Sequence, residues 1–114
     1  MLQKEYRLTS KYEYGTTKRY GKTFQGRFFH LYYLTPRNYS GPAKAGIVVS
    51  NSFSKSAVKR NRLKRVFREV VRNGYNKLPK NLWVVVYPKY FSINSKYEEI
   101  SSDFTCAILK ISVA

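Results

Sequence analysis

Residues 55–73 read KSAVKRNRLKRVFREVVRN and carry the strongest structural signal in the chain. Apolar residues recur there at the i, i+3, i+4, i+7 and i+8 spacing of one helix face: Leu63, Val66, Phe67, Val70 and Val71. Ser54 or Ser56 is suited to cap the start of such a helix, and Gly74 is suited to end it. The stretch therefore predicts a long amphipathic helix with one buried face.

Three segments around this helix have the composition of β-strands. Residues 27–34, RFFHLYYL, are dense in aromatic residues, and residues 44–50, KAGIVVS, form a second strand-like run. Residues 35–42 between them contain two prolines and predict a turn region. Residues 82–87, LWVVVY, are apolar at every position and predict a central strand that is covered on both faces and ends at Pro88.

The tetrapeptide SKYE occurs twice, at residues 10–13 and 95–98, and matches the capping-box pattern of helix starts. The first copy predicts a helix to about Tyr20, with Gly21 as the residue that follows its end. The second copy predicts the start of a final helix. Two further helices are therefore expected, one near each end of the sequence.

The predicted order is helix, strand, strand, helix, strand, helix. The second strand is expected to run antiparallel to the first, and the crossover helix predicts parallel pairing for the last strand. A fourth short strand is expected in the turn region or just before the central helix. The fold class that follows is α/β, of the α+β kind: a two-layer sandwich formed by a single domain, residues 1–114.

The charge is large and unevenly distributed. The 114 residues include 22 Lys and Arg against 6 Asp and Glu, a net charge of +16, and no acid occurs between Tyr14 and Arg68. A hydrophobic content of 43% is too high for a disordered basic tail. The pattern predicts a folded domain that binds nucleic acid, with an anionic membrane surface as the lesser alternative.

The composition argues against several other classes. The single Cys106 and the single His30 exclude a disulfide framework and a Cys/His zinc site, and no disulfide-linked partner is expected. The longest apolar run is too short to cross a bilayer, and residues 1–10 lack the apolar region of a secretory signal. A cytoplasmic protein that does not enter the membrane is therefore expected.

The central helix is also the most basic segment. Four arginines fall opposite its apolar stripe: Arg62, Arg65, Arg68 and Arg72. Lys59 and Arg60 fall on an extension of the stripe itself. A solvated helix normally interleaves acids with its basic residues, but no acid occurs here before Glu69. Arginine favours bidentate contacts to phosphate, so the outer face is predicted to bind the phosphates of a nucleic acid.

Residues 57–69, AVKRNRLKRVFRE, resemble the signature A-V-x-R-N-R-h-K-R-x-x-R-E of the protein subunit of bacterial ribonuclease P, where h is apolar. The similarity extends to residues 7–21, 27–32, 46–50 and 82–89. It implies an α/β sandwich with a left-handed β-α-β crossover, although parallel strands are generally joined by right-handed ones.

The resemblance also implies a function. Proteins of that family bind the catalytic RNA subunit and the 5′ leader of precursor tRNA, and they assist the 5′ maturation of tRNA. The RNA subunit performs the hydrolysis with magnesium. For this chain the resemblance implies no catalytic residue, no metal ligand and no cofactor bound by the protein alone.

Site residues follow from the matched positions. Those expected to bind the RNA subunit lie on or just before the central helix: Lys55, Lys59, Arg60, Asn61, Arg62, Lys64, Arg65 and Arg68. Those expected to bind the leader are Tyr14, Tyr32 and Lys18, where Lys18 stands at a position usually held by an aromatic residue. Stacking on aromatic rings holds unpaired bases with little sequence preference.

The sequence supports three alternative functions to unequal degrees. A ribosomal or other structured-RNA-binding protein would suit the same charge and the same aromatic residues. A small self-sufficient nuclease lacks support, because no carboxylate cluster for magnesium and no histidine pair is present. A membrane-surface protein is weaker still, because the basic helix needs its apolar face for the core.

Overall fold

The computed structural model describes residues 6–37, 39–49, 56–89 and 95–113. Its helices and strands, in chain order, are α1 (Lys11–Tyr20), β1 (Lys22–Gln25), β2 (Phe29–Leu34), β3 (Lys44–Ile47), α2 (Ala57–Gly74), the 3₁₀ turn η2 (Tyr75–Lys77), β4 (Trp83–Pro88) and α3 (Tyr97–Val113). The three predicted helices and the three predicted strands are confirmed, with bounds that differ by a few residues. No helix in this described part of the chain is both long and apolar enough to cross a membrane.

The four strands form one mixed sheet in the order β1-β2-β4-β3. β1 pairs antiparallel with β2, β2 pairs antiparallel with β4, and β3 pairs parallel with β4. The predicted parallel pairing of the last strand is therefore confirmed. β4 is central because its apolar side chains on both faces need cover on both sides.

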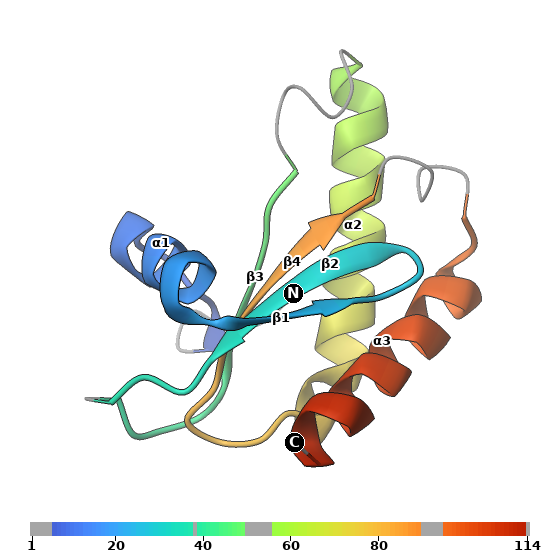
Figure 1. Cartoon of the computed structure of the whole chain (residues 1–114). Coiled ribbons are helices and arrows are strands. Elements are labelled where there is room, and N and C mark those ends of the chain that lie inside the picture. The colour runs from blue at the N-terminus through green and yellow to red at the C-terminus, as the bar shows by residue number, and fades with distance from the viewer. Residues whose placement is uncertain (1–5, 38, 50–55, 90–94, 114) are drawn as a thin grey trace.

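The connection from β3 through α2 to β4 is a left-handed crossover. In Figure 1, β3 lies to the left of the parallel strand β4, and α2 runs behind the sheet in the opposite direction. A right-handed crossover would have placed the helix on the other face. The handedness implied by the family resemblance is therefore confirmed.

The helices cover the two faces of the sheet unequally. α2 and α3 pack on one face and enclose the main core, in which Phe29, Phe67 and Phe104 are fully buried. The shorter helix α1 lies across the opposite face, where a smaller cluster forms around Leu8, Trp83 and Val85. The predicted two-layer sandwich is thus the sheet with α2 and α3, and α1 partly covers its outer face (Figure 1).

The expectation of a fourth strand in the turn region was wrong. The fourth strand is β1, at residues 22–25, and the turn-region residues 35–37 and 39–42 form no strand. Its sequence, KTFQ, has no apolar run because it is an exposed edge strand. The other expected position, just before α2, lies outside the described residues.

The two first-predicted strands, β2 and β3, run antiparallel as expected but are not neighbours. β4 lies between them and pairs with both.

The second capping box was also misplaced. α3 begins at Tyr97, and the carboxylate of Glu99, rather than that of Glu98, accepts a hydrogen bond from the backbone N–H of Lys96 at 3.3 Å. The SKYE pattern therefore located this helix start to within one residue but assigned the cap to the wrong glutamate.

Gly21 follows the end of α1 as predicted, but it is not in the left-handed conformation, since its φ is −78°. Its small size is needed because a Cβ there would lie 2.6 Å from the carbonyl oxygen of Tyr33 and would also meet the carbonyl of Thr17. The glycine therefore allows a close approach between the end of α1 and strand β2.

Candidate nucleic-acid interface

The start of α2 projects past the part of the helix that is held in the core. Ser56 caps the helix through its hydroxyl, which accepts a hydrogen bond from the backbone N–H of Lys59 at 3.3 Å. Between residues 57 and 62 no side chain is buried, whereas Leu63 and Phe67 are buried in the main core. Figure 1 shows this end of α2 extending beyond the sheet. The basic N-terminal turns are therefore accessible to a partner.

The predicted RNA-binding residues of α2 fall mostly on its outer side. We call the exposed ones the basic helix face: Lys59, Asn61, Arg62, Arg65 and Arg68. Arg60 and Lys64 are half-buried at its margin. Lys55 lies outside the described residues. Lys59 and Arg60, which fall on the extension of the apolar stripe, differ in burial: Arg60 is half-buried, whereas Lys59 is exposed.

The arginines on the outer side of α2 differ in whether a carboxylate neutralises their charge. Arg72 pairs with Glu69 at 2.9 Å, one turn apart, with both side chains 48% exposed. Within the described part of the chain, Arg62, Arg65 and Arg68 have no carboxylate partner. Their positive charges therefore remain available for an anionic ligand.

A second candidate surface lies between α1 and the outer face of the sheet. Tyr32 on β2 and Tyr87 on β4 contact each other edge-to-face, with ring centroids 5.3 Å apart and an interplanar angle of 78°. Tyr14 on α1 packs against the same apolar cluster as these two tyrosines, from the helix that lies over the outer face of the sheet. We call Tyr14, Tyr32 and Tyr87 the tyrosine cluster. Lys18, one helical turn after Tyr14, places its Nζ 5.2 Å from the ring centroid of Tyr87.

Two hydroxyl groups of this cluster, those of Tyr14 and Tyr87, stay protonated at neutral pH because the pKa of each is raised. Burial raises the pKa of Tyr14, and the nearby charge of Glu13 raises it further, while Arg7 lowers it. Burial also raises the pKa of Tyr87, with smaller contributions from Tyr32 and Tyr14. Each ring therefore offers an uncharged aromatic surface and a hydroxyl donor.

Tyr14 is held against the backbone of β3. A Cβ added at Gly46 would lie 2.6 Å from Cε1 of the Tyr14 ring, so only glycine leaves room for the ring there. The ring is half-buried in consequence. Tyr14 thus combines a structural contact on one side with partial exposure on the other.

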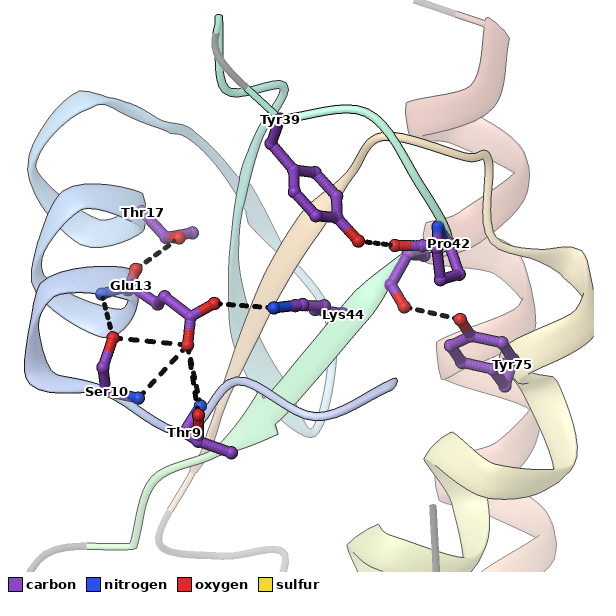
Figure 2. A network of polar contacts seen from close by, with 9 residues as sticks. Thr9, Ser10, Glu13, Thr17, Tyr39, Pro42, Lys44 and Tyr75 are labelled. Atoms are coloured by element: carbon purple, nitrogen blue, oxygen red, sulfur yellow. Dashed lines mark hydrogen bonds and ion pairs between the residues drawn. The ribbon is translucent and has the colours of Figure 1, made fainter. Parts of the chain in front are cut away.

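The position of α1 depends on a polar network around Glu13 (Figure 2). The hydroxyl of Ser10 accepts a hydrogen bond from the Glu13 N–H at 3.1 Å, and the Glu13 carboxylate accepts one from the Ser10 N–H at 3.2 Å. The predicted first capping box is therefore confirmed. The same carboxylate accepts a bond from the Thr9 N–H at 2.9 Å and pairs with Lys44 of β3 at 3.1 Å.

Burial alone would raise the pKa of Glu13. The hydrogen bonds from the Thr9 backbone, the Lys44 side chain and the Ser10 backbone outweigh it and hold the pKa below its ordinary value. The ionised carboxylate therefore ties α1 to the sheet, and this tie fixes Tyr14 and Lys18 over the strands.

A cavity of about 170 Å³ separates the two surfaces. Arg7 and Tyr14 line it on one side, and Arg68 of the basic helix face lines it on the other. The Nε of Arg7 is buried and has no hydrogen-bond partner among the described residues. None of the residues that line this cavity is acidic, so no lining carboxylate neutralises the positive charges of Arg7 and Arg68.

Sequence reasoning missed Arg7 and Tyr87. Tyr87 could have been found, because Trp83, Val85 and Tyr87 alternate along one face of β4. The uniformly apolar run obscured that alternation. Arg7 gave no local signal, since the bridge between residue 7 and Ala45 at the edge of β3 places it at the cavity that Arg68 also lines. Among the described residues, no three His, Cys, Asp or Glu side chains converge to form a metal site.

The chain is similar to one group of known proteins over nearly its whole length. The family model described as Ribonuclease P matches residues 2–112. The ribonuclease P protein component of Finegoldia magna is 32% identical over 101 residues, which are 89% of this chain and 86% of that protein. The corresponding component of Pseudanabaena sp. is 30% identical over 113 residues, 99% of this chain and 97% of that protein.

Solved structures show the same fold. The RNase P protein from Thermotoga maritima superposes with a TM-score of 0.77 at 24% identity, over 90% of this chain and 94% of that one. The Staphylococcus aureus RNase P protein superposes with a TM-score of 0.76 at 21% identity, over 94% of each chain.

Proposed function

Because the chain belongs to the ribonuclease P protein family and is the protein subunit of the endoribonuclease that matures the 5′ end of tRNA, we propose that it performs this role through two separate RNA-binding surfaces. The basic helix face binds the catalytic RNA subunit. The tyrosine cluster, with Lys18, binds the 5′ leader of precursor tRNA.

The uncompensated arginines of α2 are the observation that supports the first assignment. Arg62 and Arg65 are exposed, and neither has an acidic partner in the described structure. A folded RNA presents phosphates at a density that bidentate guanidinium contacts can match. The Arg72–Glu69 pair marks where this charge excess ends along the helix.

The chemistry of the second surface suits an unpaired strand. Tyr32 and Tyr87 present rings at an angle to each other, and Lys18 adds a positive charge above one of them. Bases of a single strand stack on such rings, while a lysine neutralises a backbone phosphate. An RNA duplex hides its base faces, so mature tRNA, which lacks the leader, gains little from this surface.

The catalytic step belongs to the RNA subunit in this proposal, and magnesium acts through that RNA. The protein's residues bind and orient the two RNAs, which raises the affinity for substrate over product. This role is a cytoplasmic one, because precursor tRNA is made and processed there.

Reconstitution tests the proposal. The purified protein alone is expected to leave precursor tRNA intact, and cleavage at the mature 5′ end is expected only after the cognate RNA subunit and magnesium are added. Cleavage at that site by RNA-free protein, at a rate that follows the protein concentration, would overturn the division of labour.

A further inference from the structure

A second groove lies at the opposite end of α1, away from the basic helix face. Its volume is about 490 Å³, within the roughly 300–1,000 Å³ of small-ligand sites. Residues from α1, the β1–β2 pair, the segment before β4 and the last turns of α3 line it, among them Tyr20, Lys22, Tyr33, Lys80, Leu82 and Ile111.

The groove combines an apolar floor with a cationic rim. Leu82 and Ile111 are buried beneath it, while Lys22 and Lys80 are exposed at its edge. None of its lining residues is acidic. A ligand with a flat apolar part and negative charge, such as a nucleotide, matches this arrangement.

Tyr20 supplies an accessible ring at the mouth of the groove. It is 66% exposed, and the guanidinium of Arg19 lies 5.4 Å from its ring centroid. The backbone beside it is fixed, because Gly21 packs so closely against the carbonyl of Tyr33 that no larger residue fits. The ring therefore projects from a rigid turn, which reduces the entropy lost when a base stacks on it.

This groove is separate from the tyrosine cluster. Tyr14 and Tyr20 are six residues apart on α1, so their side chains point about 120° away from each other around the helix. Buried Glu13 and Thr17 lie on the side of α1 that faces the sheet. Neither Tyr14 nor Lys18 lines the groove.

We propose that the groove at Tyr20, Lys22 and Lys80 binds an unpaired segment of RNA, with a base stacked on Tyr20 and phosphates at the two lysines. The proposal rests on the proposed function for the biological source of that RNA. Charge complementarity commits the site to RNA rather than to a protein segment, because the groove is cationic and free of acids.

Photo-crosslinking tests the site directly. The full chain is mixed with a short single-stranded oligouridine that carries 4-thiouridine, and the crosslinked peptides are identified by mass spectrometry. Crosslinks at Tyr20 or at the lysines are expected. The triple variant Tyr20→Ala, Lys22→Gln, Lys80→Gln should lose about 5- to 100-fold in affinity for the same RNA.

A matched control separates site binding from general charge. The Lys77→Gln, Lys96→Gln variant removes two exposed charges outside the groove, and its affinity should change less than about twofold, since only long-range charge is lost. Crosslinks confined to α2 and the tyrosine cluster would overturn the proposal, as would equal losses in both variants. So would self-association of the free protein through the groove without any RNA crosslink there. Thermal unfolding of each variant confirms that it is folded.

Two further measurements identify the source of the RNA. In the assembled enzyme, a loss seen only for precursors with long leaders identifies the distal leader, and weaker assembly identifies the RNA subunit. Both outcomes support the groove as an RNA site. Failure of the wild-type protein to assemble with the RNA subunit would refute the proposed function alone, because the oligouridine crosslink does not depend on assembly.

Discussion

The ammonium group of Lys18 lies over the ring of Tyr87, 5.2 Å from its centroid, although the two residues are 69 positions apart in the sequence. The contact joins α1 to the central strand β4 on the outer face of the sheet. A cation held over an aromatic ring at a partly exposed site is stabilised by about 0.5–1 kcal/mol. It also places a positive charge beside the ring on which a base would stack.

Replacing Lys18 by alanine should change the salt dependence of precursor binding. If Lys18 neutralises one leader phosphate, the slope of log K against log salt should become shallower by about 0.7–0.9. Binding of mature tRNA to the same assembled enzyme should keep its slope, because it has no leader. Affinities measured across a salt series for both tRNAs check this, and an identical slope change for the two would contradict it.

Replacing Tyr87 by leucine should reduce the preference for precursor over mature tRNA. Leucine keeps apolar bulk over the sheet but removes a stacking plane worth about 1–3 kcal/mol per base. The ratio of the two affinities in the assembled enzyme is the measurement. Tyr87→Phe is the control: it keeps the ring and should keep most of the preference. Equal ratios for leucine and tyrosine would exclude Tyr87 from the leader surface.

Replacing Arg65 by alanine should weaken assembly with the RNA subunit by about 1–3 kcal/mol, because a charge-assisted phosphate contact is lost. The effect should be the same with and without a leader-bearing substrate. Arg37→Ala, which removes an exposed arginine from the turn before β3, serves as the control for net charge. Titration of labelled RNA subunit measures both. A loss of affinity that appears only with leader-bearing substrate would instead assign Arg65 to the surface that binds the leader.

Much of the fold could be predicted from the sequence because its signals are local. The 3.6-residue periodicity of α2 and the Ser10–Glu13 capping box each involve residues a turn apart. The order of strands could not be predicted in this way. The apolar run at residues 82–87 predicted that β4 is central, but its insertion between β2 and β3 depends on which strands pair with it, and no local pattern records that pairing.

The candidate site was likewise predictable only where its residues lie close together in the sequence. The arginines of the basic helix face lie on one helix, so their common orientation followed from spacing alone. The tyrosine cluster consists of one residue from each of α1, β2 and β4. Only Tyr14 and Tyr32, which stand at positions matched to the family, were predicted from the sequence. Tyr87 and Arg7 contribute through contacts across the fold, which no short sequence pattern records.

Acid should destabilise the protein partly through Glu13. Its pKa is lower in the folded state than in the unfolded chain, so its contribution is present above the unfolded pKa and is lost as the pH falls through the folded value. Glu13→Gln keeps a capping-box acceptor but loses the Lys44 ion pair, at a cost of about 1 kcal/mol at neutral pH. Unfolding curves at several pH values should show the two proteins converging below about pH 4.

Replacing Gly46 by alanine should displace the ring of Tyr14. The new Cβ would lie 2.6 Å from Cε1 of that ring, so the half-buried ring must move outward. Overpacking of this kind costs about 1–3 kcal/mol of stability. The displaced ring should also reduce the precursor-to-mature affinity ratio of the assembled enzyme. Thermal unfolding and tRNA titration measure the two effects.

A neighbouring glycine provides the control for Gly46→Ala. An added Cβ at Gly15 of α1 meets no atom within 4 Å, so Gly15→Ala should leave the ratio unchanged and stabilise the helix by about 0.5–1 kcal/mol. Tyr14→Leu removes the atoms with which the new Cβ would clash. In that background Gly46→Ala should therefore cause little further loss of either stability or leader preference. If the two substitutions are additive instead, Gly46 acts on the leader surface by a route other than the Tyr14 ring.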